Sequence, residues 1–467
     1  MQRLTGLDAS FLYLETPTSH MHVASLNIYE TAGMPETWDA ESVKALIRDR
    51  LHLVPPFRRR LKEIPFQLHH PLWIEDPDFD LDHHVTDAWL PGKGTRDDLA
   101  QLAGELMGRP MDRSRPLWDM TVIHGLEDGN AAVLSRTHHA AIDGASGMDI
   151  TVNLLDLQPE PAEVAPPAEE WKPDAIPSDL QLVGHAMQSL SRQPIAAVKA
   201  ARRTTEAMFN IRQRNRQPDV TPPPGPFSAP NTPFNGSLTA RRSFGMAEIA
   251  LDDVKELRKQ VGGTINDLVL ALCAGALRMW LAERGQLPDD ALVAMCPISV
   301  RSEADKSAGG NQVSSMLVSL ATNLDDPLER VRLIQESTKH AKEQANAIGA
   351  DTLMNWAEFA APAVAASAMR LYSRMKVADR HRPFYNTVIS NVPGPQFPLY
   401  MAGAKMLAMF PMGPLNDGAG LNMTLISYLG TVHFGLVACP DLLVDVDHLA
   451  DLIPDALVEL QKAASAS

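Results

Sequence analysis

Short runs in which apolar and polar residues alternate recur along the chain, and this period of two predicts β-strands. Residues 117–126 (LWDMTVIHGL) and 131–138 (AAVLSRTH) are two such runs, and the Glu-Asp-Gly-Asn between them is typical of a hairpin turn. Residues 421–440 predict a second hairpin that turns at a Leu-Gly pair. Residues 291–301 and 311–320 predict two further strands, the first continuously buried and the second more alternating.

Helical spacing follows or separates these strands. Residues 262–285 predict a buried helix entered through a glycine turn, and residues 327–348 and 352–375 predict two more helices. Residues 143–155 switch to helical spacing directly after the first hairpin. Residues 138–144 therefore lie where a strand ends and a helix begins. Because strands and helices mix in both halves, we expect an α/β fold of two domains that face each other across a cleft.

The composition changes between residues 159 and 233, which hold 14 of the 36 prolines. Proline clusters resist both helix and sheet. One helical segment interrupts them, with Ser178 placed as its N-cap. Its expected apolar stripe is Leu180, Val183, Met187 and Leu190. We expect an N-terminal domain of residues 1–158, a proline-rich interdomain segment of residues 159–233 and a C-terminal domain of residues 234–467.

The interdomain segment also contains a basic stretch. Residues 192–216 include seven Lys or Arg residues and one Glu, although the whole chain has a net charge of −15. A basic amphipathic helix can lie on an anionic membrane surface. A solvated crossover helix whose arginines pair with acidic residues of the two domains explains the same charge. We favour the crossover helix, and both roles could share one helix.

The overall composition narrows the classes of protein. A net charge of −15 argues against nucleic-acid binding, which needs a basic face. Cys273, Cys296 and Cys439 lack the spacing of a disulfide framework or a zinc site, so we expect buried thiols in a reducing cytosol. The N-terminus has no signal-peptide pattern. The most apolar helical run, residues 359–369, is too short to span a bilayer, so membrane association is expected to be peripheral.

Adjacent histidines occur three times, but only His138-His139 is followed by an Asp-Gly pair, Asp143-Gly144. An imidazole titrates near neutral pH and can take a proton from a hydroxyl. Neighbouring strand side chains point to opposite faces, so one histidine is expected to be catalytic and the other to support it. Asp143 could fix the turn, and Gly144 could adopt a conformation closed to other residues.

Two other interpretations of this segment stay open. The pair could be surface polarity followed by an Asp-Gly turn. A metal site from His139 and Asp143 is less favoured, because zinc needs three or four ligands and no partner cluster stands out. The other pairs, at residues 69–70 and 83–84, are expected to be packing or surface histidines. No G-x-S-x-G, Walker or G-x-G-x-x-G motif occurs. The expected chemistry is base-assisted attack by a bound hydroxyl, without an acyl-enzyme.

The segment HHAAIDG matches the HHxxxDG signature of acyl-CoA-dependent acyltransferases and non-ribosomal peptide condensation domains. Within that superfamily the chain resembles the bacterial wax ester synthase/diacylglycerol acyltransferase family over nearly its whole length. Further matching elements occur in the family's order. They are RPLW (residues 115–118), TINDLVLA with Asn266 and Asp267, PISVR (297–301), GGN (309–311), SNVPGP (390–395) and the opening LTGLDASFLYLETPTSHMHV.

The resemblance implies two chloramphenicol-acetyltransferase-like domains with an active-site tunnel between them. It implies that His139 is the general base and that Asp143 is structural, salt-bridged to an arginine, for which we name Arg301. Asn266 is a candidate donor to the oxyanion or a brace for the catalytic loop, and a helix cap is an equal alternative. Asn391 lies in a turn that could line the tunnel. Trp118, in RPLW, is expected to be a packing residue.

The leading functional hypothesis is transfer of a long-chain acyl group from acyl-CoA to diacylglycerol. A fatty alcohol is the alternative acceptor, which would make a wax ester. No cofactor is expected beyond acyl-CoA as co-substrate. The expected location is cytoplasmic, peripherally on the inner membrane face or on lipid inclusions. Carrier-protein substrates are a more distant alternative, disfavoured because no carrier or adenylation segment adjoins. A non-catalytic coat protein of lipid inclusions is a hypothesis of a different class.

Overall fold

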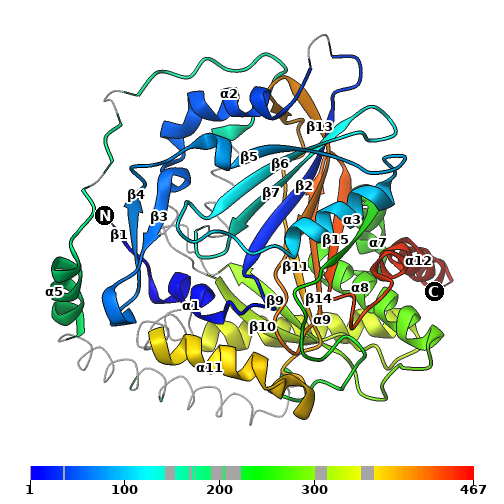
Figure 1. Ribbon diagram of the computed structural model, residues 1–467. Helices are drawn as coiled ribbons and strands as arrows, with labels where there is room; N and C mark the ends of the chain where they lie inside the picture. The colour runs from blue at the N-terminus through cyan, green and yellow to red at the C-terminus, as the bar shows by residue number, and fades with distance from the viewer. Residues whose placement is uncertain are drawn as a thin grey trace.

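A computed structural model describes residues 2–34, 37–141, 153–167, 171–173, 175–190, 202, 205, 222–299, 313–348 and 362–466. Its described part contains two six-stranded mixed sheets that lie side by side (Figure 1). The first sheet has the order β12 (Tyr400–Met401), β13 (Ala404–Met412), β2 (His22–Glu30), β7 (Ala131–His138), β6 (Trp118–His124), β5 (Val85–Trp89). The second has the order β10 (Val313–Ser319), β9 (Val293–Ser299), β11 (Thr387–Val392), β14 (Leu421–Tyr428), β15 (Thr431–Ala438), β8 (Ser243–Ala250).

Helices and a small sheet surround these two sheets. The small sheet has the order β1 (Gln2–Arg3), β4 (Leu72–Glu75), β3 (Arg59–Lys62). The described α-helices are α1 (Gly6–Leu14), α2 (Ala40–Arg50), α3 (Arg96–Met107), α5 (Asp179–Leu190), α7 (Leu251–Val261), α8 (Ile265–Glu283), α9 (Pro327–Ile348), α11 (Pro362–Arg374) and α12 (Val446–Ser465). Short 3₁₀ turns are η1 (Leu51–Leu53), η2 (Pro55–Arg58), η3 (Pro65–Gln67), η4 (Leu81–His83) and η6 (Val377–Arg380).

Both predicted hairpins are confirmed. Strands β6 and β7 pair antiparallel, as do β14 and β15. The second hairpin turns at Leu429 and Gly430, whose φ angles of 46° and 79° both lie in the left-handed region. A two-residue turn of this hand matches the twist of the flanking strands. Strands β9 and β10 also form as predicted and pair antiparallel.

One pairing crosses the division predicted from the sequence. Strand β13 comes from the C-terminal part of the chain, yet it pairs antiparallel with β2 in the first sheet. The sheets also approach each other closely at β13 and β15: a Cβ at Gly435 would lie 1.8 Å from the Pro411 carbonyl oxygen. Only glycine fits there without a shift of the backbone. The two halves therefore share a sheet as well as an interface.

Helix α8 forms the centre of the second core. As predicted, it is buried, and α9 and α12 pack against it. Among the described helices it alone is long and apolar enough to cross a membrane by length and composition, and 72% of the tested window is buried inside the protein. Burial on that scale is typical of a core helix. The three cysteines are free and buried, as expected.

The helix predicted after Ser178 is confirmed as α5, but its apolar stripe is not the side that packs against the protein. Ser178 caps this helix as expected, through the Gln181 amide. However, Leu182 and Ala186 are the buried residues and pack against Ile64 beside η3, whereas Leu180 and Met187 of the predicted stripe are 87% and 59% exposed. The helix therefore packs through a few small contacts, and these do not lie on the side where its large apolar residues are spaced. Of the basic stretch at residues 192–216, all but residues 202 and 205 lie outside the described residues.

Candidate active site

The two histidines of the HHxxxDG segment lie at the end of β7, at its junction with the following turn. His138 is opposite His22 in the pairing of β7 with β2. The His138 amide donates to the Leu117 carbonyl at 3.0 Å, and the His139 amide donates to the Met21 carbonyl at 2.7 Å. Leu117 belongs to the RPLW element and Met21 precedes β2, so two separate segments fix the backbone of the pair.

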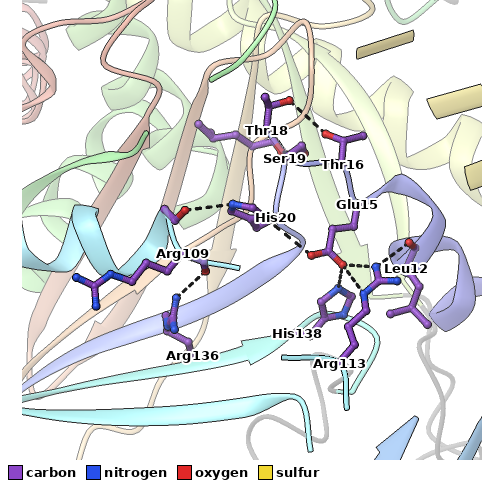
Figure 2. Close-up of polar contacts among 12 residues, drawn as sticks. Leu12, Glu15, Thr16, Thr18, Ser19, His20, Arg109, Arg113, Arg136 and His138 are labelled. Carbon is purple, nitrogen blue, oxygen red and sulfur yellow. Dashed lines mark hydrogen bonds and ion pairs between the residues drawn. The ribbon is translucent and has the colours of Figure 1, made fainter. Parts of the chain in front are cut away.

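His138 is the inward member of the pair and is almost fully buried. Its Nδ1 accepts the Ala140 amide hydrogen at 3.0 Å, so the neutral ring carries its proton on Nε2. That Nε2 lies 3.4 Å from the Glu15 carboxylate. Arg113 holds the same carboxylate with two nitrogens, its Nε at 2.9 Å, and donates to the Leu12 carbonyl at 3.0 Å. Figure 2 shows Glu15 between His138 and Arg113.

His139 is half-buried and follows the last residue of β7. Its ring stacks on Phe11, with ring centroids 3.9 Å apart and planes at 14°. Phe11 belongs to α1, and Glu15 is the C-cap residue of the same helix. Helix α1 therefore contacts both histidines: His139 through an aromatic face and His138 through a carboxylate.

Glu15 is kept ionised by its partners, whereas His138 is kept neutral by burial. Burial raises the pKa of Glu15, but contact with His138 and the charge of Arg113 outweigh it and lower this pKa to about 2. Burial lowers the pKa of His138, and Glu15 offsets that effect only in part. His22, whose ring is 5.9 Å from His138, has a pKa lowered to about 2 by burial and by the nearby His138 and Arg136. The site is therefore built around neutral imidazoles.

These buried neutral histidines predict a loss of stability in mild acid. In the unfolded chain a histidine takes up a proton below about pH 6.5, whereas His22 and His138 resist protonation in the fold. Unfolding then binds protons, so His22 should lower the free energy of unfolding by about 1.4 kcal/mol per pH unit below 6.5, and His138 should act in the same direction. Urea unfolding at pH 7.5 and 5.5 measures this loss.

A matched pair of variants tests the assignment. His22→Asn should reduce the pH dependence between 7.5 and 5.5, whereas His448→Asn, at an exposed histidine beside Glu283, should leave it unchanged. An unchanged slope in the His22 variant would contradict the role of this buried ring.

Asn391 lies in strand β11 and not in the predicted turn, and its side chain contacts Asn266 at the start of α8. The Asn391 Nδ2 donates to the Asn266 Oδ1 at 3.4 Å, from β11 to the first turn of α8. The helix cap proposed as the alternative is formed by Asp267, which makes a capping box with Thr264. Asp267 also accepts a hydrogen bond from Thr338 at 2.6 Å. Asn266 is thus not the capping side chain, and its amide is oriented by Asn391.

Several predicted site residues cannot be placed with these. Asp143, Gly144 and Arg301 lie outside the described residues, as do residues 309–311. The structure therefore brings together His138 with His139 at the end of the first sheet, and Asn266 with Asn391 on the second. The proposed ion pair of Asp143 with Arg301 stays a prediction.

Trp118 is a packing residue, as predicted. It is buried, stacks between Phe57 at 4.0 Å and His84 at 4.5 Å, and donates its indole N–H to the Phe57 carbonyl at 2.9 Å. The other histidine pairs also match their expectation. His69, His70 and His84 are buried, and the His83 side chain is half exposed. Within the described residues, no group of three His, Cys, Asp or Glu side chains could hold a metal ion.

Sequence reasoning missed Phe11, Glu15 and Arg113. The first two lie in the opening segment that resembles the family, yet no motif assigned them a role. One signal was available: Glu15 ends a helix, where a carboxylate opposes the helix dipole. A carboxylate in that position needs cationic or N–H partners elsewhere, and Arg113 with His138 supplies them.

The chain matches one family over most of its length. Residues 4–269 match the wax ester synthase/diacylglycerol acyltransferase catalytic domain, and residues 309–461 match the C-terminal domain of the same family. A Mycobacterium tuberculosis H37Rv protein named as a candidate diacylglycerol O-acyltransferase is 38% identical over 461 residues, covering 98% of this chain and 90% of that protein. Another with the same description is 34% identical, covering 100% and 97%.

Solved structures support the same conclusion. The wax ester synthase/diacylglycerol acyltransferase from Marinobacter aquaeolei VT8 superposes with a TM-score of 0.68 at 28% identity, covering 99% of this chain and 100% of that one. The first condensation domain of the calcium-dependent antibiotic synthetase has a TM-score of 0.57 at 13% identity, covering 100% and 97%, which shows a shared fold alone. Together, the fold and the HHxxxDG segment define an acyltransferase with two sheet-rich, chloramphenicol-acetyltransferase-like domains. The chain belongs to the wax ester synthase/diacylglycerol acyltransferase family.

Proposed function

We propose that this acyltransferase moves a long-chain acyl group from acyl-CoA to diacylglycerol and releases triacylglycerol and coenzyme A. The observation that carries the proposal is the His138-His139 pair, held at a strand end with His139 stacked on Phe11 and His138 fixed by Glu15. The relatives described as candidate diacylglycerol O-acyltransferases support diacylglycerol as acceptor. A fatty alcohol is the second acceptor, supported by the family's wax ester synthase activity.

In the proposed reaction His139 is the general base. Its neutral imidazole accepts the hydroxyl proton as the acceptor oxygen forms a bond to the thioester carbonyl carbon. The tetrahedral intermediate then collapses and breaks the carbon–sulfur bond. The thiolate of coenzyme A takes the proton back from the His139 imidazolium, so the enzyme returns to its starting state. No acyl-enzyme forms.

Glu15 and Arg113 act as positioning residues in this mechanism. The Glu15 carboxylate lies beside the His138 Nε2–H and orients the ring, while Arg113 holds the carboxylate in place. A locked His138 ring accepts the Ala140 amide and thereby sets the backbone that follows His139. Phe11 limits the rotation of the His139 ring. A base held in one orientation loses less entropy on reaching the transition state.

Asn266 is proposed to stabilise charge on the thioester oxygen, with Asn391 as the residue that orients it. An amide that donates to a developing oxyanion typically contributes about 10²–10³ in kcat. Asn266→Ala is therefore expected to lower kcat by about 10²-fold. Asn391→Ala should lower it about tenfold, because one orienting hydrogen bond is lost.

Steady-state kinetics measures both effects, and Asn130→Ala, at a surface turn beside Asp128, is the control. A loss of thermal stability in Asn266→Ala with kcat intact would show a purely structural role for this amide.

One assay tests the function as a whole. Purified protein receives a long-chain acyl-CoA with either a diacylglycerol or a fatty alcohol, dispersed in detergent, and thiol release is followed. The proposal expects turnover with diacylglycerol. Turnover with the alcohol alone would make the enzyme a wax ester synthase. Silence with both acceptors would favour a non-catalytic coat protein of lipid inclusions. The proposed location is cytoplasmic, at the inner membrane face or on lipid inclusions, where both acceptors reside.

A further inference from the structure

Helix α11 presents an apolar stripe to solvent. Val364, Ala368 and Leu371 follow the i, i+4, i+7 spacing of one helical face, Met375 continues this row one residue after the helix ends, and all four are exposed. The exposed fractions are 69% for Val364, 56% for Leu371 and 47% for Met375. The opposite side of the helix is packed, because Ala366 is buried. An amphipathic helix whose outer face is apolar is inverted relative to an ordinary surface helix.

The charged residues of α11 and of the two positions that follow it are all cationic, and the nearest acidic groups, Asp379 and Asp417, lie beside Tyr372 of the helix. Arg370, Arg374 and Lys376 are exposed, and residues 362–376 contain no Asp or Glu. Within the described part of the chain, no ion pair joins any of the three cations to an acidic group. The protein as a whole carries a net charge of −15, so a cluster of three cations within seven residues departs from its average. This combination of an apolar stripe and exposed cations matches an anionic lipid surface.

The apolar surface continues beyond α11. Turn η3 packs against both α11 and α5. At its tip Phe66 is 87% exposed and has a φ of 57°, an uncommon backbone conformation for a large side chain. On the other side of η3, Leu180 and Met187 of α5 are exposed as well. Figure 1 shows α11 at the lower edge of the molecule beneath α1, and α5 at the left edge near the small sheet. We call α11, η3 and α5 the apolar face.

The apolar face lies directly outside the catalytic segment. Helix α11 packs on α1, and Ala366 of α11 joins the apolar cluster that contains Ala140, which follows the two histidines. Helix α1 in turn carries Phe11 and Glu15, the side chains that contact His139 and His138. A lipid surface bound at α11 would therefore be separated from the histidines by one layer of helix.

We propose that the apolar face is the surface by which the enzyme docks on an anionic phospholipid membrane. Val364, Leu371, Met375 and Phe66 enter the interface between headgroups and acyl chains, and Arg370, Arg374 and Lys376 bind the headgroup phosphates. The inference rests on the proposed function in one respect: a water-insoluble acceptor would be reached at a membrane. The docking itself depends only on the surface.

Vesicle flotation tests the apolar face. The full chain is mixed with vesicles of phosphatidylcholine alone or with about one third phosphatidylglycerol. The unaltered protein is expected to float with the anionic vesicles. Val364→Ser/Leu371→Ser and Arg370→Gln/Arg374→Gln should each weaken binding by at least about tenfold. Val444→Ser/Val458→Ser is the matched control, since it removes two exposed valines that lie outside the apolar face.

The outcomes separate docking from catalysis. Thiol release with detergent-dispersed acceptor should be the same in the altered and unaltered proteins, because none of these residues contacts the histidines. Equal binding by the two α11 variants and the unaltered protein would overturn the proposal, as would equal binding to neutral and anionic vesicles. Absence of flotation with either lipid would also overturn it and would assign the face to a protein partner. Flotation that depends on α11, in a protein without thiol release, would keep the docking surface and reject the proposed function.

Discussion

Replacing His139 by alanine is expected to lower the rate of thiol release by about 10²–10⁴-fold, with diacylglycerol and with a fatty alcohol alike. The physical reason is that a hydroxyl is a poor nucleophile until a base takes its proton during bond formation. The loss should appear in kcat, because the imidazole acts in the transition state and adds little to acyl-CoA binding. Steady-state thiol release over a range of acceptor concentrations measures it.

A second histidine provides the matched control. His83 also belongs to an adjacent pair, but its side chain is half exposed and lies beside Asp80. His83→Ala should leave kcat and the melting temperature unchanged. His139→Ala should also retain its melting temperature within a few degrees, because His139 is only half-buried. More than a tenth of the original kcat in a folded His139→Ala protein would eliminate the general-base mechanism.

The parts of the fold that could be predicted were those with local signals. A hairpin depends on two alternating runs and the turn between them, so β6 with β7 and β14 with β15 could be located from the sequence. Helix α8 could be predicted as buried, because it is apolar on every side. The pairing of β13 with β2 joins segments almost 400 residues apart, and no local pattern encodes which distant strand occupies an edge.

The exposure of the apolar stripe of α5 has a related cause. Periodicity shows which residues of a helix share a face, but it does not show which face a neighbour covers. Helix α5 buries Leu182 and Ala186 and leaves Leu180 in solvent. The larger apolar face is then available for another partner, and burial by a lipid surface accounts for it.

The same difference between local signals and contacts of distant segments applies to the candidate site. The HHxxxDG spacing identified His138 and His139 because it is contiguous. Glu15 and Arg113 could not be found by spacing, since they come from separate segments and meet His138 only in the folded protein. The Asn266–Asn391 contact lay between these cases: both residues were selected through motifs, but their hydrogen bond required the structure.

Replacing Glu15 by glutamine is expected to destabilise the protein and slow the reaction together. In the fold the pKa of Glu15 is about 2, against an ordinary value of 4.5. A carboxyl with a lowered pKa contributes stability that is present above pH 4.5 and is lost as the pH falls towards 2. At pH 7 that contribution is about 3 kcal/mol. Glu15→Gln should therefore lose about 3 kcal/mol of unfolding free energy at pH 7 and much less near pH 3, where the carboxyl of the unfolded chain is already protonated.

The effect on the reaction follows from the position of Glu15. The variant keeps the shape of the side chain but removes the charge that orients the His138 Nε2–H. We expect kcat to fall about 10–10²-fold with KM for acyl-CoA unchanged, because Glu15 positions the histidines and does not bind substrate. Glu41→Gln is the control, since Glu41 also pairs with a cation, Lys44, but its side chain is 71% exposed. The free energy of unfolding of this variant should change by less than about 1 kcal/mol, and its kcat by less than about twofold. If Glu15→Gln lost stability but kept kcat, the carboxylate would hold α1 in place without orienting the catalytic pair.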